Sequence, residues 1–596
     1  MKSLSRHSNI LLQLFRQQKT QKQPGFLKEL CSVVPPSRFR QAATMATQPK
    51  STPARSPPCS PNSSSGPPKR QRLDAQAELN PVETSAKTSQ DSNPLKNDPM
   101  ETSKVPKANS KSKRQKKQKK KLSQSPAEQT LESNIQEIIG EEMFEKVLKA
   151  QNGWKESGWE SFDEGTEIEV EISSLSSFGD GIAISPNRNW AVVVPFCVPN
   201  DLVRLKVYRH TDTHSLGDLI SVIKPGEWRN NDLIRCKYFG KCSGCQYQMI
   251  NYDKQLELKR VVIQNAFKYH SGIAPSLLPP VEPTLASPKQ YEYRTKLTPH
   301  FELPRQLKNK KAPPIAPTDD YNSGKDGLAI GLDEKGRRRV LDIEECPLAT
   351  PKVNEKLMEE RLRVQLSIHT FKRGATLLLR ESLIRNNLQS SEPIDNESRI
   401  CVTDHKAIVR EKVGDKYFEQ NAGSFFQNNP SILESFMNYV SEMIPNTSGE
   451  KYLVDAYCGS GLFSISLAQH FTKTIGIELA ADSLNYAKQN AKLNDVTNAS
   501  FIVGEAQAIF KDLTFPADKT VVVIDPPRKG CQEEFMNQLL QYRSRFIIYV
   551  SCNVHSQVRD LNFIKDVYKI KRIRGIDFFP QTYHCESVVF LELMDP

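Results

Sequence analysis

Two residue types near the end of the 596-residue chain could perform nucleophilic and acid–base chemistry. Cys552 ends an apolar run that starts at Ile548 and opens into a polar turn, and Glu586 stands just before a second apolar run, residues 588–591. Reacting groups gather at the carboxyl ends of the strands in an open parallel sheet. The pattern therefore predicts that Cys552 is a nucleophile and that Glu586 is a base that accepts a proton.

Each of these two residues also has a purely structural interpretation. A cysteine at the end of a buried strand is more often an inert packing residue than a nucleophile, and Glu586 could be an ordinary surface acid. Both structural interpretations become less convincing when the two residues are considered together, because the strands predicted beside Cys552 and Glu586 belong to one sheet. Three other cysteines of the same region, Cys458, Cys531 and Cys585, are assigned no chemistry.

A glycine turn between a buried strand and a helix predicts a nucleotide-like ligand. Gly459 and Gly461 follow the strand that contains Asp455, and their missing side chains let the backbone approach a ligand at the helix N-terminus. The next strand ends at Glu478, and a carboxylate there is the usual partner of ribose hydroxyls. The six-residue dinucleotide fingerprint is absent, so the turn favours S-adenosylmethionine over a nicotinamide cofactor.

A third strand, residues 520–524, leads into the segment Asp525-Pro526-Pro527-Arg528. An Asp-Pro-Pro segment follows the fourth strand in many methyltransferases, which makes the interpretation more specific than the glycines alone. We therefore expect an α/β fold whose C-terminal domain is a Rossmann-like methyltransferase.

A cluster of cysteines in the middle of the chain indicates metal binding. Cys236, Cys242 and Cys245 lie within ten residues, and Cys346, which precedes a proline, is available as a fourth ligand. Four thiolates suit zinc or an iron–sulfur cluster, and the spacing does not decide between them. The alternative is a set of unliganded thiols.

Charge and composition limit the possible partners and compartments. The net charge is +13, yet residues 1–130 hold 25 Lys and Arg against 8 Asp and Glu, a net of +17, and the rest of the chain holds 57 against 61, a net of −4. An RNA-binding face on the folded part must therefore be a local patch. Twelve cysteines and no secretory signal do not predict a secreted protein, and no apolar run is long enough for a membrane span.

The N-terminal region is predicted to be a disordered basic tail. Residues 1–44 contain a single acid, Glu29, which is typical of a mitochondrial transit peptide, and Met45 is a possible second start that omits them. Basic clusters at 69–72 and 111–121 resemble nuclear-import segments, although such runs are usually only solvated charge. We expect a mitochondrial location, a nuclear and cytoplasmic one, or both.

Short strands are predicted after this tail and a helix at about 127–151. Five of them in some sixty residues suggest a small barrel of the oligonucleotide-binding type, and their order resembles a TRAM domain: 167–172, 181–184, 190–194, 202–207 and 217–223. A barrel of this size is also compatible with a plain structural module.

A strand-rich central region is expected up to about residue 415, interrupted by a polar loop at 303–326. Within it, Tyr293, Arg294 and Lys296 combine an aromatic ring with cations, as an RNA-binding surface would, although a solvated strand face looks the same. Further helices are predicted at about 253–268 and 431–444. The expected domains are the tail, a helical linker, the barrel, the central domain and the methyltransferase domain: 1–126, 127–163, 164–227, 228–418 and 419–596.

With these motifs in view, residues 164–596 resemble the RNA uracil-C5 methyltransferases, which form 5-methyluridine in transfer and ribosomal RNA. The eukaryotic and fungal enzymes that act on uracil 54 of tRNA are the most similar type. The resemblance is carried by five segments: 424–428, 455–461, 525–530, 551–553 and 584–587.

The resemblance implies roles for individual residues. Cys552 is the nucleophile and Glu586 the proton acceptor, Arg528 and Asn553 contact the substrate, and Leu462 stands where some relatives carry an asparagine. The implied contacts of S-adenosylmethionine are Gln427, Tyr457, Gly459, Gly461, Glu478, Glu505 and Asp525. The implied ligands of a [4Fe–4S] cluster, which only some members have, are Cys236, Cys242, Cys245 and Cys346.

The expected function is methylation of uracil C5 in RNA, at position 54 of tRNA, through a covalent adduct between Cys552 and uracil C6. The expected partner is RNA, without a membrane, and the expected state is a monomer. One alternative is the same reaction on ribosomal RNA, which the cysteine cluster favours. Cytosine-C5 methylation is disfavoured by the Asp-Pro-Pro-Arg segment. A non-catalytic RNA chaperone is a further alternative, and it would need neither Cys552 nor Glu586.

Overall fold

The computed structural model describes residues 126–150, 152–304, 307, 327–384, 395–446, 448–504, 510 and 513–595. The predicted tail, with its targeting segment, its second start at Met45 and its basic clusters, lies outside these residues, and so does most of the polar loop at 303–326. Among the described helices, none combines the length and the apolar character that crossing a membrane requires.

The helix expected at 127–151 is two helices. Helix α2 (Pro126–Ile139) and helix α3 (Glu141–Lys149) are separated by Gly140, whose φ of 90° lies in the left-handed region that favours glycine. The expectation of one continuous helix was therefore wrong, because the apolar spacing continues across a residue that breaks the backbone. Ile135 and Phe144, one from each helix, are buried against the sheet that follows.

This sheet has six strands in the order β1-β5-β6-β4-β3-β2, and it includes all five strands predicted there. The pairs are antiparallel except for β4 and β6, which run parallel. Its core surrounds Trp190, whose Nε1 donates a hydrogen bond to Ser215 Oγ at 2.7 Å. The strands are β1 (Glu167–Glu171), β2 (Ser174–Leu175), β3 (Gly181–Ile184), β4 (Ala191–Val194), β5 (Leu202–His210) and β6 (Ser215–Lys224).

The central region contains three small sheets and helix α6 (Pro351–Ser367), which sequence analysis missed. Apolar residues lie on both sides of α6: Val353 and Leu357 are buried, while Met358 is 54% exposed, so the helical period is diluted. The three sheets have the orders β11-β10-β9-β12, β14-β13-β8 and β15-β16. The strands are β8 (Lys296–Leu297), β9 (His300–Phe301), β10 (Ile330–Asp333), β11 (Val340–Asp342), β12 (Ala375–Thr376), β13 (Leu379–Ile384), β14 (Asp395–Val402), β15 (Ile408–Val413) and β16 (Lys416–Asn421).

The C-terminal part is built on an eight-stranded sheet with the order β19-β18-β17-β20-β21-β23-β22-β7. Of the strands described in this sheet, β23 alone runs antiparallel to its neighbours. The strands are β7 (Val281–Leu285), β17 (Tyr452–Ala456), β18 (Lys473–Glu478), β19 (Ala499–Val503), β20 (Thr520–Ile524), β21 (Phe546–Ser551), β22 (Tyr568–Ile576) and β23 (Glu586–Leu593).

Helices cover both faces of this sheet, as the continuous apolar runs of its strands require. On β20, Val521 and Val523 pack on one face, and Val522 and Ile524 on the other. The first face is covered by α7 (Pro430–Ser441), α8 (Leu462–Ser466) and α9 (Ala481–Leu493), and the second by α4 (Tyr252–His270), α10 (Glu533–Tyr542) and α11 (Val554–Leu561).

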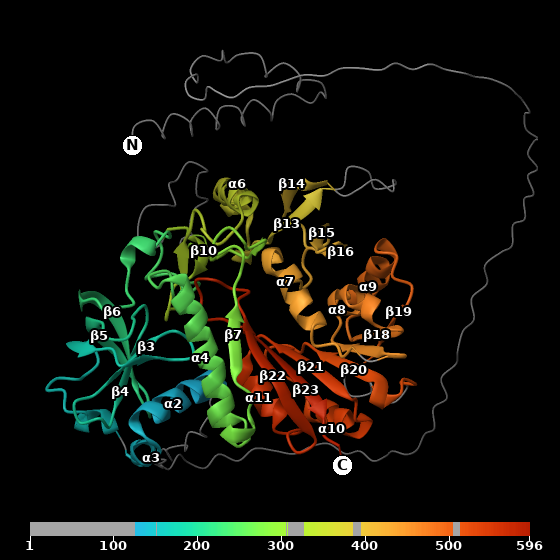
Figure 1. Ribbon diagram of the computed structural model, residues 1–596. Coiled ribbons are helices and arrows are strands. Elements are labelled where there is room, and N and C mark those ends of the chain that lie inside the picture. Colours follow the sequence, from blue (N-terminus) through green and yellow to red (C-terminus); the bar gives the residue numbers. More distant parts are fainter. Residues whose placement is uncertain are drawn as a thin grey trace, which may run out of the picture. The chain divides into compact units, whose positions relative to one another are not determined.

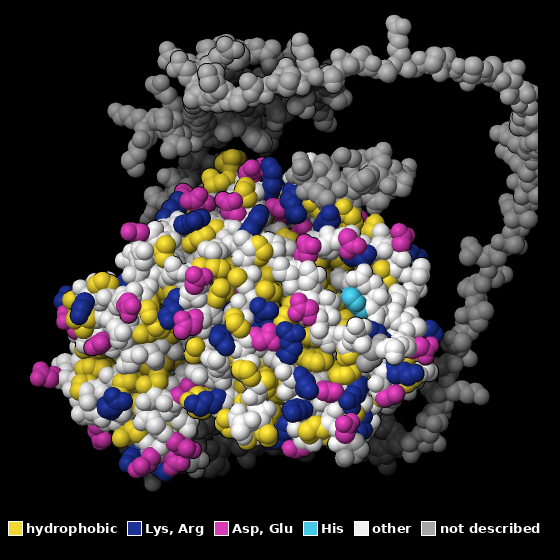
Figure 2. Space-filling view, in the orientation of Figure 1, with side chains coloured by type: hydrophobic (Ala, Val, Ile, Leu, Met, Phe, Trp, Pro, Cys, Tyr) yellow, Lys and Arg dark blue, Asp and Glu magenta, His cyan; other side chains and the backbone are white. Residues whose placement is uncertain are grey.

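Two elements from the expected central domain belong to this C-terminal layer. Strand β7 pairs parallel with β22, and helix α4 buries Ile263 and Phe267 in the same core. Figure 1 shows α4 running alongside β7 beside the C-terminal strands. In the space-filling view, lysines and arginines are interspersed with acids on the visible face (Figure 2), in keeping with the small net charge of the chain beyond residue 130.

Candidate active site

The carboxyl ends of the parallel strands surround a cavity of about 790 Å³. Its walls come from the loops after β17, β18, β20 and β21, from the segment before α7 and from the start of β23. Eight residues predicted from sequence line it: Gln427, Tyr457, Gly459, Glu478, Asp525, Arg528, Cys552 and Glu586. The parallel topology brings the carboxyl ends of β17, β18, β20 and β21 together, and the antiparallel direction of β23 places its first residue, Glu586, at the same edge of the sheet.

The predicted nucleophile and base stand at neighbouring strand ends. Strands β21 and β23 pair antiparallel, and the last pair of their ladder is Ser551 with Ser587. Cys552 directly follows Ser551, and Glu586 directly precedes Ser587, so the two residues occupy the next position along the same pair of strands. Facing residues of an antiparallel pair have their Cα atoms about 5 Å apart. A thiol and a carboxyl group can therefore reach one substrate ring.

Burial and negative neighbours favour the protonated form of the Cys552 thiol. Burial raises the pKa of Cys552 to about 12, and the charges of Glu586 and Asp525 act in the same direction. Arg528 opposes this shift through its positive charge and a hydrogen bond to the sulfur. Arg528 is therefore the group that favours the thiolate, which is the nucleophilic form of cysteine.

Two carboxyl groups of the cavity also have raised pKa values. Burial raises the pKa of Glu586 to about 8, with a further contribution from the charge of Asp525 and an opposing one from Arg528. Burial, followed by the charge of Asp455, raises the pKa of Asp525 to about 7. Like charges held close together disfavour ionisation, so a cation entering this cavity would stabilise the ionised forms.

The glycine turn after β17 has the conformation that its sequence predicts. Gly459 N donates a hydrogen bond to Glu478 Oε2 at 3.1 Å, and a Cβ built at Gly459 would enter open space among the described atoms. Gly461 has a φ of 93° and begins α8, and a Cβ there would lie 2.8 Å from Ile465 Cδ1. Gly461 thus shapes the turn rather than the cavity wall.

Asp455 is a buried carboxylate beneath this turn that sequence analysis did not place in the site. Its Oδ2 accepts hydrogen bonds from Ser464 N at 2.8 Å and Ser464 Oγ at 2.5 Å, while its Oδ1 has no partner among the described residues. Burial raises the pKa of Asp455 to about 7. The feature of the sequence that could have identified Asp455 is its position near the end of a buried strand.

Asn553 holds two loops together instead of lining the cavity. Its Oδ1 accepts a hydrogen bond from His555 N at 3.2 Å and caps α11, and its Nδ2 donates to the Arg528 carbonyl at 3.1 Å. The loop that carries Cys552 is therefore tied to the loop that carries Asp525 and Arg528. Glu505, the last of the predicted cofactor residues, lies outside the described part of the chain.

Two aromatic residues differ from expectation. Phe425 lines the cavity although its side chain is 76% exposed, and sequence analysis gave it no role. Tyr293 was predicted to contribute to an RNA-stacking surface, but it is 2% exposed and donates a hydrogen bond to the Pro580 carbonyl at 3.1 Å. Stacking by Tyr293 was therefore a wrong prediction, because its ring is enclosed by protein.

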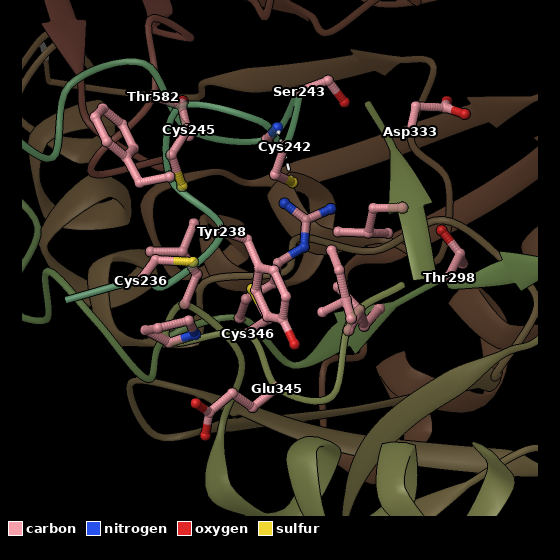
Figure 3. Close-up of a pocket in the computed structure, with 18 of the residues that line it drawn as sticks. Cys236, Tyr238, Cys242, Ser243, Cys245, Thr298, Asp333, Glu345, Cys346 and Thr582 are labelled. Carbon is pink, nitrogen blue, oxygen red and sulfur yellow. Dashed lines mark hydrogen bonds between the residues drawn. The ribbon is translucent and has the colours of Figure 1, made fainter. Parts of the chain in front are cut away.

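The four predicted metal ligands, Cys236, Cys242, Cys245 and Cys346, line a second cavity of about 490 Å³ (Figure 3). Cys346 is brought to the other three by the chain between β11 and α6, and its N donates a hydrogen bond to Asn354 Oδ1 at 2.9 Å. As the side chains are placed, no three His, Cys, Asp or Glu residues within the described ranges are close enough to hold a metal ion.

Burial raises the pKa of each of these four thiols, to about 11 for Cys242. Gln248 approaches two of them: its Oε1 accepts a hydrogen bond from Cys236 N at 3.1 Å, and its side chain hydrogen-bonds the Cys245 sulfur, which lowers the pKa of that thiol. Four half-buried thiols around one cavity form a donor set that suits a thiophilic metal centre.

Comparisons with known proteins identify the family. The model of the family described as tRNA (Uracil-5-)-methyltransferase matches residues 395–594. The tRNA (uracil(54)-C(5))-methyltransferase of Schizosaccharomyces pombe is 49% identical over 441 residues, which cover 72% of this chain and 79% of the relative. This chain belongs to the tRNA (uracil-5-)-methyltransferase family. The Saccharomyces cerevisiae member, also a tRNA (uracil(54)-C(5))-methyltransferase, is 40% identical over 471 residues, covering 71% of this chain and 73% of the relative.

A solved structure extends the likeness to the fold. The crystal structure of a Pyrococcus abyssi tRNA (uracil-54, C5)-methyltransferase in complex with S-adenosyl-L-homocysteine matches with a TM-score of 0.50 and 23% identity, covering 71% of this chain and all of that chain. The α/β methyltransferase fold predicted from the sequence is thereby confirmed, and so is the family predicted from its motifs.

Proposed function

We propose that this chain methylates C5 of uracil 54 in tRNA, with S-adenosylmethionine as the methyl donor. The observation that carries the proposal is the position of Cys552 and Glu586 at adjacent strand ends in one cavity, beside a glycine turn. This arrangement occurs in a chain that is 49% and 40% identical to two tRNA (uracil(54)-C(5))-methyltransferases. The chemistry and the family therefore support the same reaction.

Cys552 is proposed to start the reaction by activating the uracil ring. Uracil C5 is a weak nucleophile, but attack of a thiolate on C6 forms a carbon–sulfur bond and turns C5 into an enolate-like carbon. Arg528, which hydrogen-bonds the sulfur and carries a positive charge, favours the thiolate that this step needs. S-adenosylmethionine supplies a methyl group on a sulfonium, and C5 takes that methyl with loss of the neutral thioether.

Glu586 is proposed to complete the reaction as a general base. After methyl transfer, C5 still carries its proton, which the Glu586 carboxylate removes. The electron pair of that bond restores the C5–C6 double bond, the bond between C6 and the Cys552 sulfur breaks, and the thiolate leaves. Because the pKa of Glu586 is raised to about 8, its ionised form binds a proton more strongly than an ordinary carboxylate does.

The cofactor is proposed to lie between the glycine turn and the Asp525 loop. The Glu478 carboxylate already accepts bonds from Gly459 N and Ala480 N and keeps further lone pairs for ribose hydroxyls. Gln427 and Tyr457 line the same cavity as Glu478. The acidic character given by Asp525 and Glu586 suits the positive charge of a sulfonium. The unpaired Oδ1 of the buried Asp455 is a further acceptor beneath the turn.

We propose that Cys236, Cys242, Cys245 and Cys346 hold a [4Fe–4S] cluster. The proposal is supported by their common cavity and by the four half-buried thiol donors that line it. The methylation consumes no electrons, so the cluster would brace the fold or position the RNA. If a thiolate-ligated cluster is present, anaerobically purified protein should absorb light at about 400 nm. Colourless protein with one zinc per chain would contradict it.

The six-stranded sheet is proposed to be a barrel of the TRAM or oligonucleotide-binding type that contacts RNA beside the active site. Five predicted strands and a buried core around Trp190 support this assignment. Because a base inside folded RNA cannot reach Cys552, the target uridine must also leave its stack.

Nucleoside mass spectrometry tests the proposed function. The purified full chain and S-adenosylmethionine are added to tRNA and ribosomal RNA from cells that lack the protein. We expect 5-methyluridine to form in tRNA, at position 54, at close to one per molecule. Its formation only in ribosomal RNA would overturn the substrate and keep the chemistry, and 5-methylcytidine instead of 5-methyluridine would overturn the reaction.

A further inference from the structure

We infer that Gln255 and Gln581 position the proposed proton acceptor Glu586 by tying the loop before it to the cysteine loop. The connecting loop is defined as residues 577–585, between β22 and β23, and the cysteine loop as residues 242–248. The inference rests on the proposed function, which gives Glu586 its role. Gln255 and Gln581 are positioning residues, since neither lines the cavity that holds Cys552 among the residues described there.

The connecting loop lies between the two cavities. Thr582 and His584 line the cavity of the four cysteines, and Glu586, two residues after His584, lines the cavity of Cys552. A displacement of this loop would act on Glu586 directly, because Glu586 is the residue that follows it in the chain. The loop is therefore the shortest covalent path between the cysteine site and the proposed base.

Gln581 is the point at which the connecting loop is held. It is 3% exposed and has a φ of 71°, a left-handed conformation that is uncommon for a residue other than glycine. Its carbonyl accepts hydrogen bonds from the backbone N–H groups of Gln246 and Tyr247, both at 3.1 Å. The cysteine loop thus binds the backbone of Gln581 through the residues that directly follow Cys245.

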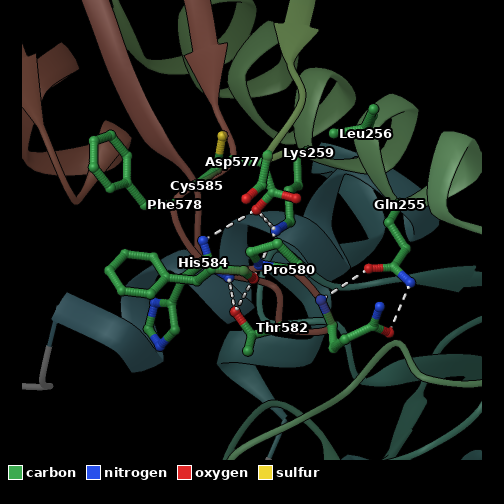
Figure 4. A network of polar contacts seen from close by, with 12 residues as sticks. Gln255, Leu256, Lys259, Asp577, Phe578, Pro580, Thr582, His584 and Cys585 are labelled. Carbon is green, nitrogen blue, oxygen red and sulfur yellow. Dashed lines mark hydrogen bonds and ion pairs between the residues drawn. The ribbon is translucent and has the colours of Figure 1, made fainter. Parts of the chain in front are cut away.

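Gln255, a 1% exposed residue of α4, joins the same two loops through one side-chain amide. Its Oε1 accepts from Gln581 N at 3.0 Å, and its Nε2 donates to Gln581 Oε1 at 3.0 Å. The same Nε2 also donates to the carbonyls of Tyr247 and Ile250. Figure 4 shows the amide of Gln255 facing the connecting loop. The reciprocal amide pair fixes both the backbone and the side chain of Gln581.

Independent contacts hold the first half of the connecting loop. Lys259 Nζ lies 2.5 Å from Asp577 Oδ1 with both side chains fully buried, and it also donates to the Phe579 carbonyl. Tyr252 Oη donates to Asp577 Oδ2 at 3.0 Å. Loss of the amide pair therefore leaves the loop attached at Asp577 and loosens the half that leads to Glu586. A positioning role of the amide pair can therefore be distinguished from a general role in folding.

A displaced base would stop the reaction at a recognisable stage. Cys552 would still add to C6, and C5 would still take the methyl, but removal of the C5 proton would slow and the adduct would persist. A misplacement of about 1 Å can slow a step by roughly a hundredfold. The signature is a covalent enzyme–RNA adduct that survives denaturant while free 5-methyluridine forms slowly.

The test is a single-turnover reaction of the full-length Gln581→Gly variant with unmodified tRNA and S-adenosylmethionine. Glycine adopts a φ of 71° without strain, so the backbone conformation and the bond from Gln581 N to Gln255 Oε1 are kept, while the bond from Gln255 Nε2 to the Gln581 side chain is removed. We expect release of methylated tRNA to slow by at least about tenfold, the denaturant-resistant adduct to rise, and the cofactor Kd to stay within twofold. Gln581→Asn, which tolerates this φ but has a shorter side chain, should give an intermediate result.

Two further variants make the result decisive. Asn498→Ala removes a side-chain amide that donates to the carbonyls of Ala468 and Phe471 on the same domain, and it should leave adduct and product at wild-type levels. Glu586→Gln should accumulate the adduct. If it does and Gln581→Gly behaves like the wild type, or loses adduct and product together, the inference alone is overturned. If Glu586→Gln accumulates none, the proposed role of Glu586 fails and the inference fails with it.

Discussion

Asn553 Nδ2 donates a hydrogen bond to the Arg528 carbonyl at 3.1 Å, which joins the loop of the proposed nucleophile to the loop of the cation beside it. The same side chain caps α11 through its Oδ1. One residue thus couples the start of a helix to the relative placement of Cys552 and Arg528. Sequence analysis predicted a substrate contact at Asn553, and the structure gives the side chain two partners within the protein.

Two substitutions at Asn553 distinguish its N-cap hydrogen bond from its hydrogen bond to the Arg528 carbonyl. Serine retains an oxygen for the N-cap but is too short to reach the Arg528 carbonyl, whereas alanine loses both contacts. We expect Asn553→Ser to keep the free energy of unfolding within about 0.5 kcal/mol and Asn553→Ala to lower it by about 1 kcal/mol. Both should reduce kcat by a similar factor, measured by methyl incorporation into tRNA. Full activity in Asn553→Ser would show that the bond to Arg528 is dispensable.

Substitution of Cys552 tests the nucleophile itself. A serine hydroxyl is far less nucleophilic than a thiolate, so Cys552→Ser should lower the methylation rate on the order of a thousandfold or more. Affinities for tRNA and for S-adenosylmethionine, measured by filter binding and calorimetry, should stay within a few-fold. Cys401→Ser, at a cysteine of β14 that is not among the residues lining the cavity of Cys552, is the matched control. Equal losses in the two variants would indicate a structural role for the thiol.

Arg528 should control the reactivity of the Cys552 thiol. Its charge and hydrogen bond lower the pKa of Cys552 against the upward effect of burial. In Arg528→Gln, the pKa should rise further, so alkylation of Cys552 by iodoacetamide should slow at every pH below the pKa. The rate is followed on the Cys552 peptide by mass spectrometry, with the Cys401 peptide as internal reference. An unchanged pH profile at Cys552 would contradict the assigned effect of Arg528.

The acids of the cavity predict a pH dependence of cofactor binding. The pKa of Asp525 is raised to about 7 and that of Glu586 to about 8, so both groups lose charge as the pH falls through these values. A bound sulfonium favours their ionised forms. The affinity for S-adenosylmethionine should therefore increase as the pH rises from 6 to 8.5, with release of protons on binding.

S-adenosylhomocysteine, whose sulfur is neutral, serves as the control for that measurement. Its Kd should change much less over the same pH range, and its binding should release fewer protons in calorimetry with buffers of different ionisation enthalpy. An identical pH dependence for the two ligands would mean that the acids do not sense the sulfonium. Glu586→Gln should remove only the part of the dependence that lies near pH 8.

Local patterns were sufficient to predict the strands that carry the site. The buried runs that end at Ala456, Glu478, Ile524 and Ser551 were recognisable because a strand buried on both faces is largely apolar. Parallel topology brings the carboxyl ends of these strands, and with them Cys552, to one edge of the sheet, whereas Glu586 reaches that edge because β23 runs antiparallel to β21. Cys346 lines the same cavity as the other three cysteines, and their predicted role as metal ligands stays a prediction.

Features that depend on distant pairing were missed. Nothing local indicates that β7 pairs with β22, or that Gln255 meets Gln581 across more than three hundred residues. In the sequence, Tyr293 has the pattern of an exposed aromatic residue beside Arg294. In the folded protein, packing encloses its ring. Glutamines carry no periodic signal, because a buried amide is recognisable only by its partners.

The central claim is that Cys552 forms a covalent bond to uracil 54, and trapping that bond tests it most directly. In tRNA that contains 5-fluorouridine, C5 carries fluorine in place of the proton that Glu586 removes, so the methylated adduct cannot eliminate Cys552. The full chain, this tRNA and S-adenosylmethionine should give a conjugate stable in denaturant, with the nucleotide attached to the Cys552 peptide. A conjugate on another cysteine, or methylation of normal tRNA without any trapped conjugate, would contradict the account.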